Sequence, residues 1–165
     1  MTECTRMANE IDQRDRLRNF RLRAPSILDG ANLHSLTLEV LRDRLQLVDV
    51  RDDELDSVRL VQPRKKNNNA QSSAGMLLVR LQSMERRDQV LRNRRLLKGT
   101  KFTITEDLTG PNLELLKQLQ SDARAQSVWS WGGRIFATTS TGKKVTAKLF
   151  MTNNKIFVDG CDDYD

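Results

Sequence analysis

The sequence predicts an α+β protein of two small modules, a βαββαβ unit followed by a helix and a small antiparallel sheet. Three observations predict this organisation. Segments of alternating hydrophobicity and segments with a 3.6-residue period follow one another in the order βαββαβ up to residue 107. The segment TEDLTGPN then combines turn residues with a helix start. Short alternating segments separated by turn residues, among them glycine and asparagine pairs, complete the chain.

The first 24 residues contain a polar segment and the first strand. Residues 1–17 are polar, and their few apolar side chains are spaced too irregularly for a heptad seam. We expect a polar tail or the remnant of a coiled coil there. Over residues 20–24, apolar side chains alternate with Arg21 and Arg23, which predicts a half-buried strand with guanidinium groups on its exposed face.

The rest of the first module, which we place at residues 18–107, supplies two helices and three strands. A 3.6-residue period predicts a helix with one apolar face, made of Leu33, Leu36, Val40, Leu41 and Leu45. Apolar runs predict strands at 55–61 and 76–81, and the segment 63–75 between them has loop composition. Ser83 can cap a second helix that Gly99 ends, and alternation from Phe102 predicts the fourth strand. This βαββαβ order is shared by ferredoxin-like folds and RNA-recognition modules, so we expect an RNA-recognition-like unit.

The second module is expected at residues 108–165. Gly110 and Pro111 suit a helix start, and a leucine stripe continues to Ala123. Alternating segments at 128–131, 134–139, 144–150 and 155–158 predict a small antiparallel sheet, because Gly and Asn turn residues separate them.

Positive charge is concentrated in one segment. Residues 84–101 carry seven Arg or Lys against two acids, whereas residues 1–82 balance 14 basic against 12 acidic side chains and residues 102–165 balance 7 against 8. A local basic segment indicates a surface for an anion, and the dominance of arginine suits phosphate. The alternative is a solvated helix face that only aids solubility.

Two tryptophans leave two interpretations open. Trp129 and Trp131 are two residues apart, so they share one face of a strand, near Arg134 and the lysine pair Lys143 and Lys144. They could pack against the helix over 111–125, or they could form a platform on which bases stack. Of the two, Trp131 is expected to be the more exposed.

No pattern indicates catalysis, a cofactor or a metal. The chain has no phosphate-binding loop of the GxxxxGK[ST] type, and its single histidine, His34, lies within a helical pattern. The carboxylates over 49–56 lack the spacing of a calcium loop, and Cys4 and Cys161 form no zinc motif. No apolar run approaches the length that spans a bilayer. We therefore expect no enzyme, no cofactor and no membrane partner, and a location in the cytoplasm that can extend to the nucleus.

The segment VLRNRRLLKGTKFTITEDLTGPNLELL, followed by AR and VWSWGGRIF, resembles a known family. This is the C-terminal region shared by the first-frame proteins of insect LINE retrotransposons and the baculovirus "few polyhedra" (FP) proteins. The resemblance covers roughly residues 17–158, and the upstream part looks like the family's noncanonical RNA-recognition module. It implies that two modules flank a cleft for single-stranded nucleic acid, and that the protein is a chaperone of retrotransposon RNA. An upstream coiled coil oligomerises such proteins, but almost none precedes Leu17 here, so self-association would need a missing or truncated segment.

Sequence and resemblance together predict a binder of single-stranded RNA or DNA with little sequence preference. The resemblance implies contacts from Arg92, Arg94, Arg95, Lys98 and Arg134. The residue patterns add Arg21, Arg23, Arg80, Lys101, Trp131, Lys143 and Lys144. The alternative function is an FP-like viral or host module that binds protein through a basic docking helix.

Overall fold

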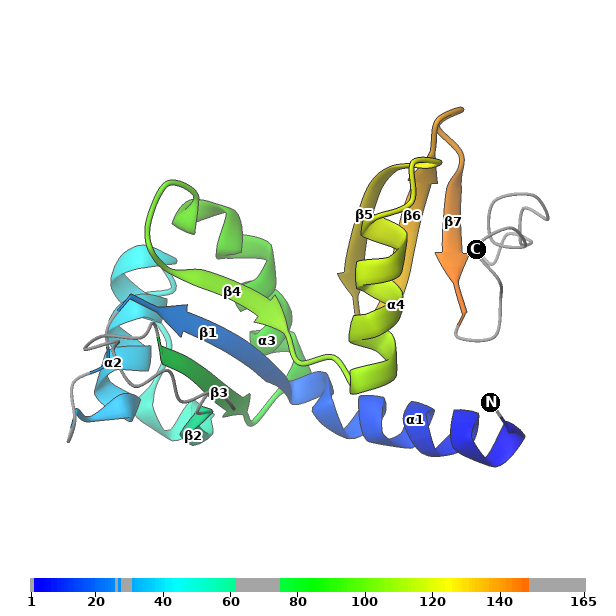
Figure 1. The fold of residues 1–165 in the computed structure, drawn as a ribbon. Coiled ribbons are helices and arrows are strands. Elements are labelled where there is room, and N and C mark those ends of the chain that lie inside the picture. Colours follow the sequence, from blue (N-terminus) through cyan, green and yellow to red (C-terminus); the bar gives the residue numbers. More distant parts are fainter. Residues whose placement is uncertain (1, 26, 28–30, 62–74, 149–165) are drawn as a thin grey trace, which may run out of the picture. The chain divides into compact units, whose positions relative to one another are not determined.

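The structure is a computed structural model that describes residues 2–25, 27, 31–61 and 75–148. It divides into two compact units, one formed by Arg18–Asp107 and the other by Met1–Leu17 together with Leu108–Asp165. The described residues form four α-helices, a four-stranded antiparallel sheet and a separate three-stranded antiparallel sheet (Figure 1). The α+β fold class expected from the sequence is confirmed. Most of the loop expected at 63–75, residues 149 and 150, and the strand expected at 155–158 lie outside the described residues.

The unit Arg18–Asp107 has the element order βαββαβ. Its elements are β1 (Asn19–Ala24), α2 (Leu33–Glu39), β2 (Leu55–Val61), β3 (Gly75–Leu81), α3 (Met84–Asn93) and β4 (Thr103–Glu106). The strand order across the sheet is β2-β3-β1-β4, and each neighbouring pair is antiparallel. Figure 1 shows α2 and α3 on the same face of this sheet. This is the split βαβ arrangement, in which one face of the sheet packs on helices and the other stays open.

Alternation along the strands separates the core face from the open face. Leu22 of β1 and Leu77 of β3 are cross-strand partners, and both are fully buried. Val90 of α3 is also fully buried. Full burial of one such side chain stabilises the fold by roughly 1.5–3 kcal/mol. Arg21 and Arg23 occupy the intervening positions of β1 and lie on the open face, as the alternation predicted.

The first helix of this unit changes its period in the middle. α2 runs directly into a π-helical turn, η2 (Val40–Arg44). A π-turn adds one residue to the helical repeat, so the apolar stripe moves around the helix. As a result, Leu33 and Leu36 stay partly exposed, although the 3.6-residue period assigned them to the apolar face. The buried apolar side chains of the segment are Leu38, Val40, Leu41 and Leu45.

The second unit places one helix against the three-stranded sheet. Its elements are α1 (Glu3–Asp15), α4 (Gly110–Gln120), β5 (Ala125–Trp131), β6 (Arg134–Thr139) and β7 (Lys144–Ala147), with sheet order β5-β6-β7. The side chain of Thr109 caps α4, and Pro111 sits in its first turn, which confirms the predicted helix start. The core between α4 and the sheet consists of Leu108, Leu115, Leu119, Ile135, Ala137, Val145 and Ala147.

Helix α1 contacts α4 and the β5–β6 turn of this unit. The Oε1 atom of Gln13 accepts hydrogen bonds from Thr109 N and from Asn112 Nδ2, both at 2.9 Å. Asn112 Nδ2 also donates to Gly133 O at 3.2 Å. Gln13 is buried, and its side chain fills the space in which a Cβ on Gly133 would lie. The segment expected as a polar tail or coiled-coil remnant therefore forms a helix whose last turn is part of a buried polar network.

Candidate nucleic-acid interface

The basic segment of the sequence ends in a cluster of cations on the unit Arg18–Asp107. Helix α3 continues as a 3-10 turn, η4 (Arg94–Leu97), and then turns into β4. We name the cations of this region the basic end of α3; they are Arg92, Arg94, Arg95, Lys98 and Lys101. Arg94 is half-buried and the other four are exposed. Positive charge in this place is favoured by the dipole of the helix, whose carboxyl end is negative.

A tight turn orients the last two lysines of the basic end. Gly99 has a φ of 83°, a backbone conformation that side chains with a Cβ rarely adopt. The carbonyl oxygen of Leu97 accepts from Thr100 N at 3.0 Å and from Thr100 Oγ1 at 2.7 Å. Lys98 and Lys101 lie on the two sides of this turn. Gly99 was predicted to end the helix, but the α-helix itself already ends at Asn93 and the 3-10 turn lies between them.

The basic end has few neighbouring negative charges. Arg94, Arg95, Lys98 and Lys101 form no ion pair with a carboxylate in the described part of the chain. A further cation, Arg44, stands over the ring of Phe102, with its Cζ atom 4.5 Å from the ring centroid. Arg44 was not predicted as a site residue, because only the fold brings η2 to the end of α3. Several cations are therefore available to phosphate groups at this end of the unit.

The first two arginines of the basic segment have a different environment. Arg86 Nε lies 2.7 Å from Glu54 Oε2, and Arg86 Nη2 lies 3.0 Å from Asp49 Oδ2. Hydrogen bonds from Arg86 hold the pKa of both carboxyl groups below its usual value. Arg87 is buried and donates from Nη1 to Glu106 Oε1 at 3.0 Å. These two arginines hold the unit together, and they are not part of the candidate interface.

The open face of the four-stranded sheet carries Arg21, Arg23 and Arg80, as predicted, but two of them have acidic partners. Arg21 Nε donates to Asp107 Oδ1 at 2.9 Å, and the side chain of Asp107 is only 2% exposed. Arg80 Nε lies 3.6 Å from Asp56 Oδ2. The charge of these two arginines is therefore largely compensated within the unit, whereas Arg23 is exposed.

A fourth arginine on this open face was missed from the sequence. Arg59 of β2 is exposed and is the register partner of Leu78 of β3. Leu78 is two residues away from Met76 and from Arg80, so all four side chains lie on the open face. Alternation within the strand would have found Arg59. Aromatic side chains occupy none of the strand positions on this face, in agreement with the sequence analysis, so the usual stacking of bases on an RNA-recognition sheet has no platform here.

The three-stranded sheet has a face of another kind, opposite α4. Ile135 and Ala137 point toward α4, so Phe136 between them points away. The ring of Phe136 stacks on that of Trp129, with the centroids 5.8 Å apart and an angle of 19° between the planes. Lys144 Nζ lies 4.8 Å from the centroid of Phe136 and 5.6 Å from that of Trp129.

We name this surface the outer face of the three-stranded sheet. It consists of Trp129, Trp131, Arg134, Phe136 and Lys144, and Lys143 stands in the adjoining turn. The interpretation in which the tryptophans pack against the helix over 111–125 is therefore wrong. Phe136 was missed from the sequence, although the two-residue turn Gly132-Gly133 could have shown that it lies opposite Trp129.

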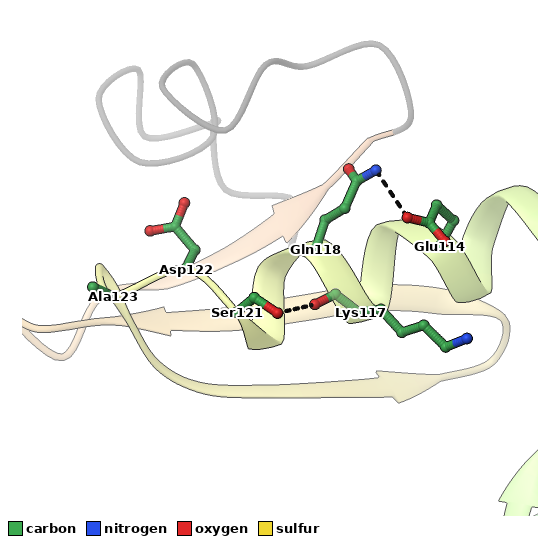
Figure 2. Close-up of a pocket in the computed structure, with 6 residues that line it drawn as sticks. All are labelled: Glu114, Lys117, Gln118, Ser121, Asp122 and Ala123. Carbon is green, nitrogen blue, oxygen red and sulfur yellow. Dashed lines mark hydrogen bonds between the residues drawn. The ribbon is translucent and has the colours of Figure 1, made fainter.

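A shallow depression of about 570 Å³ on the unit with α4 does not coincide with any of these surfaces. It is lined by Glu114, Lys117, Gln118, Ser121, Asp122 and Ala123 (Figure 2). Gln118 donates to Glu114 Oε1, and Ser121 Oγ donates to the carbonyl oxygen of Lys117. With two acids against one lysine and no aromatic side chain, this depression does not suit an anionic ligand.

The remaining expectations concern metals, membranes and relatives. Among the described residues, no group of three or more His, Cys, Asp or Glu side chains could hold a metal ion. None of the helices in this part of the chain has the length and apolarity needed to cross a bilayer. No protein-family model matches the chain, and a search of curated proteins finds no match either. The resemblance to the LINE and FP proteins therefore stays a prediction.

Proposed function

We propose that the protein binds single-stranded RNA or DNA with little sequence preference. In this proposal the βαββαβ unit is an RNA-recognition-like module that uses the basic end of α3 as its main phosphate contact. The resemblance to LINE first-frame proteins adds a role as a nucleic-acid chaperone in a retrotransposon ribonucleoprotein. The protein is not an enzyme in this account.

One observation carries the proposal. Within ten residues the basic end provides five cations, and four of them, Arg94, Arg95, Lys98 and Lys101, form no ion pair with a carboxylate in the described ranges. Each phosphate that a cation neutralises releases condensed counterions, so such a cluster supplies affinity without reading sequence. Arginine strengthens the effect, because its planar guanidinium pairs with phosphate through two hydrogen bonds.

The lack of sequence preference follows from the same surfaces. Base-specific recognition requires hydrogen bonds to base edges from side chains held in fixed positions. The open face of the four-stranded sheet instead carries long arginine side chains, and two of these, Arg21 and Arg80, are engaged by Asp107 and Asp56. Contacts to phosphate therefore dominate the expected affinity.

A salt titration of binding tests the proposal. The probe is a fluorescently labelled single-stranded RNA of about 20 nucleotides, a length that covers the usual site of one small module. We compare the wild-type chain with the variant Arg94→Gln/Arg95→Gln/Lys98→Gln. Each phosphate contact with a single strand contributes about 0.7 to the slope of log K against log salt, so the variant should lose about 2 from the slope.

The control removes the same charge elsewhere. The variant Arg14→Gln/Arg51→Gln/Lys117→Gln also loses three exposed cations, none of them in the basic end. It should keep the slope of the wild type. The proposal fails if the wild-type chain does not bind the RNA at low salt, or if both triple variants lose affinity equally.

A second candidate function is a protein-docking module that uses the same basic helix. One observation favours it: Leu96 lies among the cations of the basic end and is 43% exposed, which is unusual for a large apolar side chain on a phosphate-binding surface. An acidic partner protein with an apolar anchor residue would use both the exposed Leu96 and the cations around it. The variant Leu96→Ser separates the two functions, because it should leave RNA binding unchanged and abolish docking to such a partner.

A further inference from the structure

The outer face of the three-stranded sheet is built around a turn that aligns aromatic side chains. Gly132 and Gly133 have φ values of 59° and 75°, the conformation of a type I′ hairpin turn. A two-residue turn of this type makes Trp131 the partner of Arg134, and Trp129 the partner of Phe136. The aromatic pair is therefore held by the backbone of the hairpin.

Strand alternation keeps this pair away from the core. Val128, Ile135 and Ala137 form or border the buried layer beneath α4, and Trp129 and Phe136, which alternate with them along the strands, point to the other side. Trp129 and Phe136 are half-buried, and their rings are stacked nearly parallel. Half-exposed, nearly parallel rings offer an apolar aromatic surface of the kind on which a nucleobase stacks.

The strands that carry the rings contain charged residues of one sign only. The segment 125–148 contains no Asp or Glu, whereas it contains Arg134, Lys143, Lys144 and Lys148. Arg134 is exposed at the start of β6, and Lys144 lies over both rings. A ligand that fits this face combines a planar ring with negative charge.

We propose that the outer face is a base-stacking site for single-stranded nucleic acid, in which the Trp129/Phe136 pair receives a base and Lys144 binds the neighbouring phosphate. This inference rests on the proposed function, and it adds to it a second surface with another chemistry. Lys144 covers the rings through cation–π contacts. An incoming base replaces the ammonium group on the rings, and the ammonium group then pairs with the phosphate attached to that base.

This site distinguishes unpaired bases from duplex. In a double helix the faces of the bases are stacked on one another, so the platform reaches none of them, whereas a single strand can place one base on it. An acidic peptide would satisfy Lys144 and Arg134 but would leave the ring faces unused. We therefore commit to single-stranded nucleic acid as the occupant of the outer face.

The test compares ordinary and abasic oligonucleotides of the same length, because an abasic strand keeps the phosphates and lacks the rings. We expect the full chain to bind the ordinary strand roughly 10-fold more tightly than the abasic one. The variant Phe136→Leu should lose most of this difference and leave the affinity for the abasic strand unchanged. The triple variant of the basic end should weaken binding of both strands.

Fluorescence follows the platform directly. The chain has two tryptophans, so Trp129 is the only indole in the variant Trp131→Phe. Its emission should be quenched by the ordinary strand and much less by the abasic strand, because only a stacked base quenches an indole at contact. The variant Lys144→Gln, which removes no ring, should retain the quenching but lose affinity for both strands.

The outcomes separate the two proposals. If the wild type binds both strands equally and the Trp129 emission does not change, the base-stacking site is overturned while the phosphate-binding function stands. If neither strand binds at low salt, the proposed function fails. A melting curve would show whether Phe136→Leu unfolds. If it does, binding and quenching by the ordinary and the abasic strand, measured on Trp131→Phe and Lys144→Gln, still test the base-stacking site. Quenching by an acidic peptide and not by the ordinary strand would also overturn the base-stacking site.

Discussion

The two sheets of this protein have a common plan and different exposed faces. In each unit one face of an antiparallel sheet packs on one or two helices, and among the described residues no helix covers the other face. On the open face of the four-stranded sheet, Arg21 and Arg80 have acidic partners, and aromatic residues occupy none of the strand positions. On the outer face of the three-stranded sheet, aromatic rings and cations lie together in a segment without any acid.

The difference shows that the number of arginines does not measure the capacity of a surface for anions. An arginine beside a buried carboxylate stabilises the fold, and its charge is compensated. A cation without such a partner keeps its charge available for phosphate. By this criterion the basic end of α3 and the outer face are the two candidate surfaces, and most of the open face is structural.

The largest effect is expected from the buried pair Arg87 and Glu106. Arg87→Ala would remove the guanidinium group that donates to the carboxylate of Glu106, which is 5% exposed. Breaking a buried ion pair costs about 3–5 kcal/mol, so urea denaturation should show a loss of that size. Arg95→Ala, a few residues further along the same segment and exposed, should change the free energy of unfolding by less than about 0.5 kcal/mol. Equal losses in the two variants would show that the basic segment has a single role.

A smaller loss of stability is expected from Arg21→Ala. The buried carboxylate of Asp107 would lose its guanidinium partner and keep the hydrogen bond from Asn19 Nδ2 at 3.0 Å. The expected cost is roughly 1–3 kcal/mol. The matched control is Arg23→Ala, on the same face of the same strand, and it should be nearly neutral in thermal unfolding. If Arg21→Ala did not change the stability, Arg21 would again be a candidate phosphate contact.

The pH dependence of stability tests the role of Arg86. The pKa of Glu54 is lowered from 4.5 in the folded protein by the hydrogen bond from Arg86. Because the folded pKa lies below the unfolded one, this contribution is complete above about pH 4.5 and disappears as the pH falls through the lowered pKa. Arg86→Gln should therefore destabilise the protein by on the order of 1 kcal/mol at neutral pH and by less in acid. A constant difference between the two proteins from pH 7 to strongly acidic pH would contradict this assignment.

The smallest effect is expected from the arginines of the open face that form no ion pair in the described part of the chain. Arg23 and Arg59 are both exposed. The double variant Arg23→Gln/Arg59→Gln should reduce the salt slope of RNA binding by at most about 1, against about 2 for the triple variant of the basic end. A larger reduction would make the open face, and not the basic end of α3, the main phosphate contact.

Local patterns predicted much of this fold. Alternation over 20–24 placed Arg21 and Arg23 opposite the core, and Ser83 caps α3 as expected. Such features depend on residues close together in the chain. The two-residue turn Gly132-Gly133 also contained enough information to pair Trp129 with Phe136, because a hairpin turn sets the register of its strands.

Long-range pairing could not be predicted from those patterns. Arg86 and Arg87 look like the other cations of their segment, and only the fold brings Glu54 and Glu106 to them. Helix α1 is a second example, because its buried contact is made by Gln13, a polar residue that no hydrophobic pattern marks. The π-turn after α2 likewise shifted the apolar stripe in a way that a fixed 3.6-residue period misses.

The salt dependence of single-stranded RNA binding by the wild-type chain tests the central claim most directly. With at least three phosphate contacts at the basic end, log K should fall against log salt with a slope of about −2 or steeper, from a measurable affinity at about 50 mM salt. The triple variant Arg94→Gln/Arg95→Gln/Lys98→Gln should show a slope shallower by about 2, because it loses three phosphate contacts of about 0.7 each. No binding at about 50 mM salt, or the same slope in the wild type and the triple variant, would contradict the account.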